Sequence, residues 1–330
     1  MDKEENKKMK VAIIVPYFGK LPNYFQVFLD SCSYNSGFDW IIFTNDSTNY
    51  KYPTNVHPIT MTFEECRAIV QDHFDFVVSL SSPQKLCDYK CAYGYIFQAY
   101  LAGFDWWGYC DLDQIFGNLG AFITEEMLKK YDKIGSLGHL TLYRNTSGNN
   151  LMFLSDLNGR PRYREVFTTE RGCAFDEWLP DNINEIYLES GRPVMLDSIG
   201  ADVNAYRTTF QLFDLDVQNR CYIQSTIKNS VFLWNNGQLT QIYMENNVLQ
   251  QREFPYVHLQ KRQMKDCRTD KNADCFYIVP NRLVDGKADV KQLIRNSRYK
   301  GIVNIQYFKV KWKSLKYRLK SGNWKFDNIF

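Results

Sequence analysis

The sequence has no stretch that could span a membrane and none that resembles a secretion signal. A membrane-spanning helix needs about 18 consecutive apolar residues, but the most apolar segment, residues 91–104, is shorter and contains Gln98. The first eight residues, MDKEENKK, include no apolar run and so differ from a signal peptide. We therefore expect a cytoplasmic protein that does not cross the membrane.

Several chemical signatures are also absent. Neither GxGxxG nor GxxxxGK[ST], the two commonest glycine-rich phosphate loops, occurs in the chain. No internal repeat of solenoid period is present. The 9 cysteines are odd in number and include no CxxC pair, which argues against a disulfide scaffold or a cysteine-ligated zinc and favours reduced thiols.

The net charge of the chain is small, but the basic and acidic residues are unevenly distributed along it. The 40 Lys and Arg nearly balance the 37 Asp and Glu, for a formal charge of +3. Residues 291–330 hold 11 basic side chains and one acidic one, which is +10, so the preceding 290 residues carry 29 basic and 36 acidic side chains, or −7. The sequence therefore combines a mildly acidic body with a strongly basic C-terminal segment.

The remaining composition is that of a globular protein. Hydrophobic residues make up 45% and charged residues 23% of the chain, and 330 residues suit one large domain or two ordinary ones. Aromatic residues reach 16%, which favours a ring-rich core and grooves that stack on bases or sugars.

The first 60 residues predict an α/β fold. Strands are predicted over 10–15 and 39–44, because their residues 11–15 and 40–43 are unbroken apolar runs, typical of strands buried on both faces of a parallel sheet. Helical spacing over residues 24–33 lies between them, and residues 56–61 predict a third short strand. This order predicts a βαβ start to the sheet.

Later elements follow from periodicity and turn residues. A hairpin is predicted over 230–243, because Asn236–Gly237 is typical of a type I′ turn between two apolar runs. Helices are also expected at about 83–102, 118–131, 163–168 and 182–190, and strands at 105–110, 133–143 and 254–259. We predict one domain over residues 1–280 and a basic amphipathic segment over 281–330.

Two Asp-x-Asp pairs occur, and their contexts differ. Asp111 and Asp113 follow a buried aromatic strand, and in open α/β sheets ligands bind beyond the carboxyl ends of strands. Two such carboxylates can approach one divalent cation, a hard ion that prefers oxygen ligands. Asp214 and Asp216 follow a less regular segment and are expected in a turn or at a solvated edge.

The order of these features resembles a GT-A glycosyltransferase over residues 10–265. The resemblance consists of Pro16-Tyr17-Phe18 after the first strand, Asp46 after the second, a helix with Lys85-x-x-Asp88-x-Lys90, and Tyr109-Cys-Asp-Leu-Asp113. Residues 106–119 are similar to bacterial capsule and exopolysaccharide glycosyltransferases. The resemblance implies a Rossmann-like mixed sheet with flanking helices and a metal-dependent transfer of sugar from a nucleotide sugar.

The resemblance also assigns site residues. The metal, Mn²⁺ or Mg²⁺, would bind Asp113 directly and share Asp111, which also reaches the ribose. A late histidine a few residues before a diphosphate-binding lysine is a third ligand in many such enzymes, and His258 with Lys261 fits that pattern. Further nucleotide-sugar contacts are expected from Pro16, Tyr17, Phe18, Asp46, Lys85, Asp88, Lys90 and His139.

Each of these assignments has a structural alternative. Lys85 and Asp88 could simply form an i,i+3 ion pair. His139 could be a structural histidine, and His258 could be a surface histidine at a strand end. His57 and His73 are expected to be structural.

A second pair of carboxylates is the candidate for acceptor chemistry. Asp176 and Glu177 lie between Phe175 and Trp178, rings that could stack on a sugar. In an inverting enzyme one carboxylate would deprotonate the acceptor hydroxyl. In a retaining enzyme, which the late His and Lys resemble more, the same residues would orient hydroxyl groups. Asp202 is a weaker candidate of the same kind, and a solvated helix start is the alternative for Asp176 and Glu177.

The basic segment predicts a surface helix. Phe308, Trp312, Leu315 and Leu319 share one helical face among Lys and Arg, as in helices that bind anionic membrane surfaces. Packing on the body and nucleic-acid binding are the alternatives, and we expect no nucleic-acid partner.

Taken together, the sequence predicts a transferase that uses a UDP-sugar and a glycan or lipid-linked acceptor in bacterial surface polysaccharide synthesis, at the inner face of the cell membrane. Two other functions compete with this one. A sugar nucleotidyltransferase is disfavoured because its glycine-rich signature is absent, and a non-catalytic nucleotide-sugar or glycan-binding protein is disfavoured by the intact Asp-x-Asp.

Overall fold

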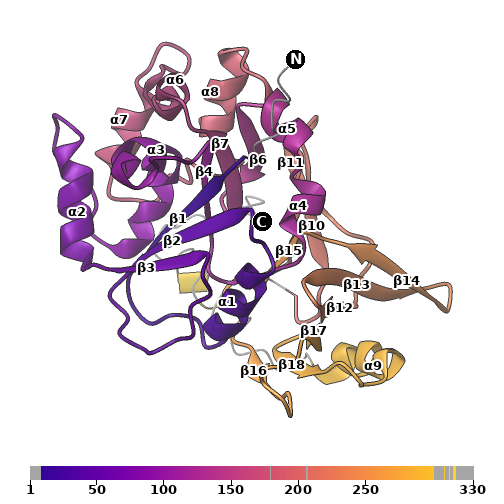
Figure 1. Cartoon of the computed structure of the whole chain (residues 1–330). Coiled ribbons are helices and arrows are strands. Elements are labelled where there is room, and N and C mark those ends of the chain that lie inside the picture. The colour runs from indigo at the N-terminus through magenta and orange to yellow at the C-terminus, as the bar shows by residue number, and fades with distance from the viewer. Residues whose placement is uncertain are drawn as a thin grey trace, which may run out of the picture. The chain divides into compact units, whose positions relative to one another are not determined.

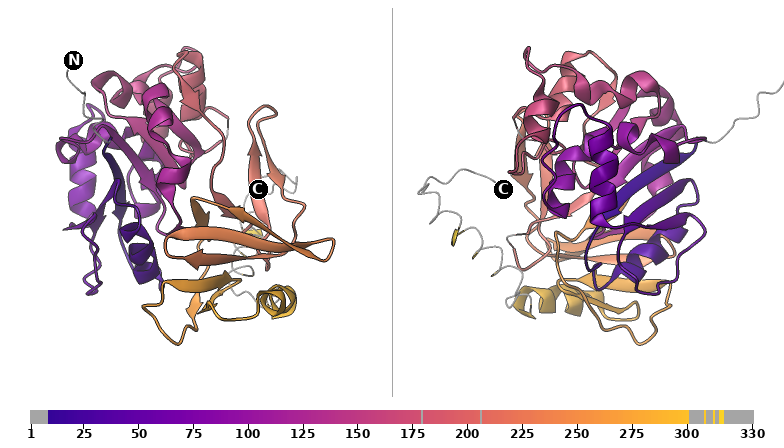
Figure 2. Two further views of the ribbon diagram at one scale, coloured as in Figure 1. Left: turned by 45° about the vertical axis from the view of Figure 1, so that its right-hand side comes forward. Right: turned by 90° about the vertical axis from the view of Figure 1, so that its left-hand side faces the viewer.

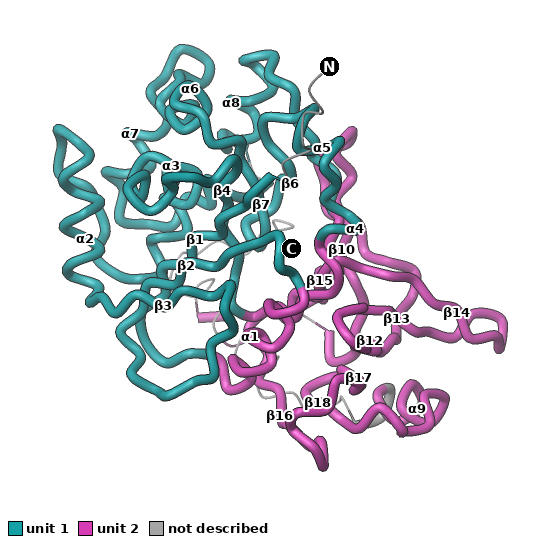
Figure 3. Tube along the Cα trace, in the orientation of Figure 1, with its two compact units in different colours: residues 1–21, 35–112, 120–198 teal, residues 22–34, 113–119, 199–330 magenta. Residues whose placement is uncertain are grey.

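The computed structural model describes residues 9–178, 180–205 and 207–300, together with Phe308, Trp312, Leu315 and Lys316. The chain divides into two compact units (Figure 3). Unit 1 comprises residues 1–21, 35–112 and 120–198, and unit 2 comprises residues 22–34, 113–119 and 199–330. The division separates Asp111 from Asp113, because it falls immediately after Leu112.

Unit 1 contains a seven-stranded mixed sheet in the order β3-β2-β1-β4-β7-β6-β8 (Figure 1). Its strands are β1 Val11–Tyr17, β2 Phe38–Thr44, β3 Val56–Thr60, β4 Trp106–Cys110, β6 Lys133–Leu137, β7 Leu140–Arg144 and β8 Val194–Met195. The first four strands in sequence are parallel neighbours, and β7 joins β4 in the antiparallel sense. The apolar runs of β1, β2 and β4 are buried, as their composition predicts.

Short helices surround this sheet. The α-helices are α2 Phe63–Asp72, α3 Tyr93–Ile96, α5 Glu125–Lys130, α6 Ser147–Asn150, α7 Arg162–Phe167 and α8 Ile183–Glu189. The 3-10 helices are η1 Pro83–Ala92, η2 Gln98–Tyr100 and η3 Met152–Leu154, and α4 Leu119–Phe122 lies where the chain passes back into unit 1. The core is rich in rings, including Trp107 stacked on Tyr143 with 4.5 Å between centroids.

Three elements of this unit differ from the sequence prediction. The helix expected over 83–102 is mainly η1, whose tight turns place residues i and i+3 on one side and so let Lys85 pair with Asp88. The helix expected over 118–131 is interrupted at Thr124, whose side chain caps α5 by accepting a hydrogen bond from the Met127 backbone. The strand expected over 133–143 is the β6–β7 hairpin.

Over its described residues up to 300, unit 2 contains two sheets and two helices. One sheet has the order β11-β10-β9-β15-β5, and the other has the order β14-β13-β12-β17-β18-β16. The strands are β5 Gln114–Phe116, β9 Ala201–Val203, β10 Leu212–Asp216, β11 Cys221–Gln224, β12 Ser230–Asn235, β13 Gln238–Glu245, β14 Val248–Glu253, β15 Tyr256–His258, β16 Lys265–Asp266, β17 Cys275–Val279 and β18 Arg282–Asp285. The helices are α1 Phe25–Ser33 and α9 Val290–Lys300.

The predicted β12–β13 hairpin is present. Its strands pair from Ser230↔Tyr243 to Asn235↔Gln238, and Asn236 and Gly237 both have positive φ, as a type I′ turn requires. Helix α9 packs on the neighbouring strands through Ile294, which is buried with Val231 and Tyr277 (Figure 2).

The α/β class and the mixed sheet with flanking helices are confirmed. The predicted boundary at residue 280 falls between β17 and β18, which pair with each other. Of the basic segment, the structure describes α9 and four later helical residues, Phe308, Trp312, Leu315 and Lys316; Leu319 lies outside the described residues. Within the described part of the chain, no helix combines the length and apolarity that a membrane span requires.

Candidate functional site

The carboxyl ends of β1 and β2 carry the first group of predicted residues. Pro16 and Tyr17 are the last residues of β1 and are half-buried, and Tyr17 pairs in register with Thr44 at the end of β2. Asp46 ties the two loops together, because its carboxylate accepts hydrogen bonds from the backbones of Leu21 and Thr48. The hydrogen bonds from Thr48 lower the pKa of Asp46.

Phe18 is buried, unlike the half-buried Pro16, Tyr17 and Asp46. Its ring is buried in the core and packs against Phe63, with 5.6 Å between centroids. Of the two rings expected to contact the nucleotide, Phe18 is therefore unavailable, whereas Tyr17 is half-buried and its contact stays a prediction.

Lys85 and Asp88 form an internal ion pair. Their side chains are both 2% exposed, and Lys85 Nζ lies 2.7 Å from Asp88 Oδ2. Asp88 also accepts hydrogen bonds from the backbones of Cys173 and Phe175, while Lys85 donates to the carbonyl of Arg171. The pair fixes the loop that leads to Asp176, and neither side chain is exposed to a ligand, which corrects the predicted substrate contact.

Lys90 is the centre of a buried charge cluster in unit 1. Its Nζ donates to Asp111 Oδ1 at 2.9 Å and to the Gly138 carbonyl at 2.8 Å, and it lies 3.2 Å from Asp176 Oδ2. Asp111 follows β4, and its backbone donates to the carbonyl of His139. The structure therefore brings together Lys90, Asp111 and Asp176, which lie far apart in the sequence.

The pKa values in this cluster reflect one cation among several carboxylates. Burial would lower the pKa of Lys90, but Asp111 and Asp176 raise it well above its ordinary value. Burial raises the pKa of Asp176 to about 6, against the opposing effect of Lys90. Burial, followed by repulsion from Asp176, raises the pKa of Glu177 to about 7. Both carboxyl groups therefore titrate near neutral pH.

Gly138 allows these carboxylates to approach the β6–β7 turn. A Cβ at this position would collide with Asp176 and would lie 2.6 Å from Glu177 Oε1. The flanking rings do not form a sugar platform, because Phe175 and Trp178 are buried. Asp176 is itself only 3% exposed, so the expectation of a solvated helix start is wrong for it.

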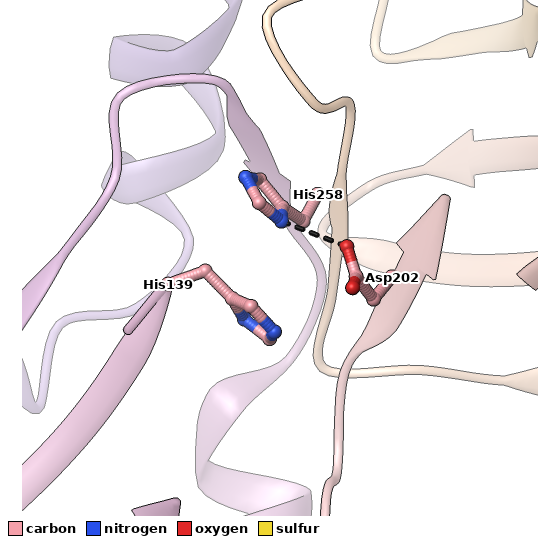
Figure 4. A group of neighbouring side chains, drawn as sticks. All are labelled: His139, Asp202 and His258. Atoms are coloured by element: carbon pink, nitrogen blue, oxygen red, sulfur yellow. Dashed lines mark hydrogen bonds and ion pairs between the residues drawn. The ribbon is translucent and has the colours of Figure 1, made fainter. Parts of the chain in front are cut away.

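The second cluster lies in unit 2 around His258. Its Nδ1 lies 2.8 Å from Asp202 Oδ1 (Figure 4). Its Nε2 lies 3.2 Å from Asp113 Oδ1. The arrangement follows from strand pairing: β15 lies between β9 and β5, which places His258 opposite Asp202 on one side and Gln114, the residue after Asp113, on the other.

The chemistry of this donor set fits a divalent cation. Burial would lower the pKa of His258, but Asp113 and Asp202 raise it well above its ordinary value. Burial would raise the pKa of Asp113, but His258 holds it below its ordinary range. Carboxylate oxygen and imidazole nitrogen are both ligands for Mn²⁺, and metal-binding histidines commonly use their other nitrogen on a carboxylate, as His258 does with Asp202.

The turn after β15 closes around Asp113. Gln260 and Lys261 both have positive φ, and the Lys261 backbone donates a hydrogen bond to Asp113 Oδ2. Gln260 Nε2 donates to Asp202 Oδ1 at 2.7 Å. The Lys261 side chain is exposed. This turn therefore holds both carboxylates of the cluster and presents a lysine beside them.

His139 belongs to unit 1, and the second Asp-x-Asp pair belongs to unit 2. His139 is buried at the β6–β7 turn of unit 1. Asp214 is exposed on β10, and Asp216 accepts hydrogen bonds from the backbone and the side chain of Asn219. The second pair is thus at a solvated edge and a turn, as its sequence context predicts.

Two residues of the unit 2 cluster, Asp202 and Gln260, are not evident from the sequence. Asp202 was only a weak candidate, and Gln260 was not considered. The available signal was local: Asp202 is the middle residue of the short β9 after Gly200, and Gln260 follows His258 by two residues. Neither feature reveals that β9 and β15 are neighbours, which is what brings the two side chains together.

Comparisons with known proteins give limited guidance. No curated protein matches the chain. Among solved structures, the chain is similar to the galactosyltransferase LgtC, solved in complex with donor and acceptor sugar analogs, with a TM-score of 0.32, 10% identity, and coverage of 59% of this chain and 75% of that one. A likeness this weak assigns neither fold nor activity.

One family of sequences matches most of the chain. Its description is "Family of unknown function (DUF6625)", and the match covers residues 13–287. The matched segment includes both charge clusters and ends before α9. The chain therefore belongs to the DUF6625 family, whose function is unknown.

Proposed function

We propose that this protein is a metal-dependent GT-A glycosyltransferase that moves a sugar from a nucleotide sugar, most simply a UDP-sugar, to a glycan or lipid-linked acceptor. The observation that carries the proposal is the His258 cluster. A histidine lies between Asp113 of the Asp-x-Asp and Asp202, in a buried position formed by three paired strands.

Asp113 and His258 would hold Mn²⁺ or Mg²⁺, with Asp111 two residues earlier in the chain. Consecutive Cα atoms are about 3.8 Å apart, so the Cα atoms of Asp111 and Asp113 are separated by no more than about 7.6 Å. A bound divalent ion supplies positive charge that stabilises the diphosphate leaving group. Asp202 keeps the His258 ring oriented, and Lys261 adds a cation for the diphosphate.

The residues of unit 1 have complementary roles in the proposal. Tyr17, with Pro16 and Asp46, contacts the nucleoside at the carboxyl ends of β1 and β2, and His139 contributes to the sugar pocket. Lys90 holds Asp111 and the buried Asp176 in place, and the half-buried Glu177 next to Asp176 orients sugar hydroxyl groups. We infer retention of configuration: the bond from the anomeric carbon to the diphosphate breaks, a bond to the acceptor oxygen forms, and the acceptor proton passes to the diphosphate.

Slow hydrolysis of the donor tests the catalytic proposal without a known acceptor. The full chain is incubated with UDP-glucose, UDP-galactose, UDP-N-acetylglucosamine or UDP-glucuronate and with Mn²⁺, and released UDP is measured. We expect release with at least one donor, abolished by EDTA. Asp113→Asn should reduce it by about 1,000-fold, because a metal ligand is lost.

Asp216→Asn is the matched control, since it changes the other Asp-x-Asp at an exposed turn. No UDP release from any donor, together with no thermal shift by UDP and Mn²⁺, would contradict the proposal. A thermal shift without release would favour a non-catalytic nucleotide-sugar binder. Release of pyrophosphate from UTP and a sugar phosphate would favour a nucleotidyltransferase.

We also propose that the basic C-terminal segment binds the inner face of the cell membrane, in surface polysaccharide synthesis. The described residues Phe308, Trp312 and Leu315 are helical and exposed, at 57%, 60% and 41%. Their spacing of four and three residues places them on one helical face. Lys and Arg around them favour anionic lipids by about 1 kcal/mol for each residue near the surface.

Flotation with vesicles tests this placement. The full chain should float with phosphatidylglycerol-containing vesicles but not with phosphatidylcholine vesicles. A chain ending at residue 300 should stay in the dense fraction while retaining UDP release. Equal flotation of both chains would contradict the membrane proposal and leave the catalytic one unaffected.

A further inference from the structure

We propose that unit 2 has a second saccharide-binding pocket, separate from the His258 cluster, that takes a neutral stretch of glycan. The pocket has a volume of about 370 Å³ and lies at the turn between β12 and β13. It is lined by Tyr34, Asn118, Asn235, Asn236, Gly237 and Gln238.

The wall of the pocket is preformed. Gly237 packs directly on Tyr34, and a Cβ at position 237 would lie 2.7 Å from the Tyr34 side chain, so only glycine fits. The Tyr34 ring meets Trp234 edge-on with 5.1 Å between centroids, and its hydroxyl donates to Asp274 Oδ1 at 2.8 Å. The Asn236 backbone donates to the carbonyl of Asp274. These contacts fix the ring and the turn before any ligand binds.

The lining groups match the hydroxyl groups of sugars. Each amide side chain offers an acceptor oxygen and two N–H donors, and a sugar hydroxyl both donates and accepts. The side chains of Asn118, Asn235 and Gln238 are exposed, and the Tyr34 ring is 41% exposed beside them. Polar groups that fix orientation next to an aromatic face are typical of a ligand pocket.

The same lining argues against a charged ligand. None of the six lining residues carries a formal charge, so the lining offers no cation to a phosphate or a carboxylate. The turn itself explains Asn236, because a type I′ turn favours Asn at positive φ. It does not require amides at positions 118, 235 and 238, which come from two separate segments of the chain.

The position of the pocket relates it to the proposed reaction. Strand β5 connects Asp113, just before its first residue, to Asn118, two residues after its last. The Gly117 backbone still bonds to the Pro255 carbonyl beside β15, so this segment remains extended. At roughly 3.3 Å per residue, Asp113 and Asn118 lie roughly 16 Å apart. The pocket is therefore suited to hold an acceptor chain some distance from its reacting end.

The choice of a glycan as ligand rests on the proposed transferase function, but the binding can be measured without catalysis. Saturation-transfer NMR and titration calorimetry with maltotriose, cellotriose and chitotriose on the full chain should detect binding of at least one of these neutral trisaccharides. Asn118→Ala with Gln238→Ala should weaken that binding by about tenfold, as expected for two lost hydrogen bonds of ~1 kcal/mol each with partial compensation.

Two further variants separate the ring from its hydroxyl group. Tyr34→Phe keeps the stacking face and should bind as the unchanged chain does, whereas Tyr34→Leu should lose binding. Gln251→Ala, an exposed amide on β14, is the control and should have no effect. Circular dichroism checks that each variant folds. If Tyr34→Leu does not fold, the test rests on the double variant of Asn118 and Gln238, whose side chains are exposed.

The result that overturns the inference is distinct from the one that overturns the transferase proposal. If the unchanged chain binds none of the three trisaccharides, or if the double variant binds as tightly as the unchanged chain, the pocket is not a glycan site. Metal-dependent UDP release should be unchanged in the double variant. Trisaccharide binding without UDP release would support the glycan site and contradict the transferase proposal. UDP release without trisaccharide binding would support the transferase proposal and contradict the glycan site.

Discussion

The two charge clusters of this protein differ in their balance of charge. In unit 1, Lys90 lies between Asp111 and Asp176, with Glu177 next in the chain, and burial followed by repulsion among the carboxylates raises the pKa values of Asp176 and Glu177. In unit 2, His258 lies between Asp113 and Asp202, and the pKa of Asp113 is lowered. In the first cluster the raised pKa values favour protonated carboxyl groups on Asp176 and Glu177, whereas in the second Asp113 is ionised and the proton is on His258.

The difference indicates separate roles. A carboxylate that is ionised and oriented at neutral pH is suited to bind a cation. Carboxyl groups that titrate near neutral pH are suited to exchange hydrogen bonds with sugar hydroxyls as they gain or lose a proton. The chain joins the two clusters through Leu112 alone, since Asp111 belongs to one and Asp113 to the other.

The largest expected effect comes from removing Lys90. Lys90→Met leaves Asp111 and Asp176 without their cation, and breaking a buried ion pair should lower the free energy of unfolding by about 3 kcal/mol. Urea denaturation measures this, with Lys129→Met, an exposed lysine on α5, as the control. A loss below about 1 kcal/mol would mean that Lys90 does not balance these carboxylates.

The next effect concerns the orientation of His258. Asp202→Asn removes the carboxylate from Nδ1, and loss of such an outer partner typically weakens metal binding by about 10- to 100-fold. Electron paramagnetic resonance of free Mn²⁺ measures the affinity directly. Asp214→Asn, an exposed carboxylate on β10, should leave it unchanged. Equal affinity in both variants would contradict the role assigned to Asp202.

A second buried lysine of unit 1 contrasts with Lys90. Lys133 donates to Asn184 Oδ1 at 2.6 Å and to the Gly135 carbonyl, and burial lowers its pKa to about 7, partly opposed by Cys91. The unfolded chain keeps the proton of this lysine to higher pH than the folded chain does. Loss of that proton in the folded state should therefore raise the free energy of unfolding by about 1 kcal/mol between pH 7 and 8. Lys133→Met should lack that rise in urea denaturation at the two pH values, and an identical rise in both proteins would contradict it.

The smallest expected effect is at Glu177. Because its pKa is raised to about 7 in the folded protein, the folded state holds a proton that the unfolded chain has already lost above its ordinary pKa. Stability should therefore fall as pH rises from 5 to 7, by less than about 1 kcal/mol after allowance for partial exposure. Glu177→Gln should flatten this dependence in thermal unfolding, and a steeper fall in the variant would contradict the assignment.

The strands were the most predictable part of the fold. The apolar runs of β1, β2 and β4 are buried on both faces, so their composition alone indicates them. The segment over 83–102 was predicted as one regular helix because its apolar spacing has helical period. Tertiary contacts of Lys85 and Lys90 with distant carbonyls favour a tighter helix there, and local periodicity does not contain that information.

The candidate site likewise could be predicted only where local sequence pattern identifies it. Asp111, Asp113 and His258 were identified from local pattern and resemblance, and their metal-binding role remains a prediction. Phe18, Phe175 and Trp178 were assigned to ligands because they are aromatic, yet all three are buried. A ring that packs in a core and a ring that stacks on a sugar have the same sequence signature, and only burial distinguishes them.

The sequence by itself determined the buried strands, the Asn236–Gly237 turn and the separation of an acidic body from a basic C-terminal segment, because each depends on neighbouring residues. The tertiary structure decided which charged groups meet. Lys90 reaches Asp176 across 86 positions and His258 reaches Asp202 across 56, because strand order and register bring such residues together. Burial set the direction of the pKa shifts of Asp176, Glu177 and Lys133. Facing charges reversed the effect of burial at Lys90, Asp113 and His258.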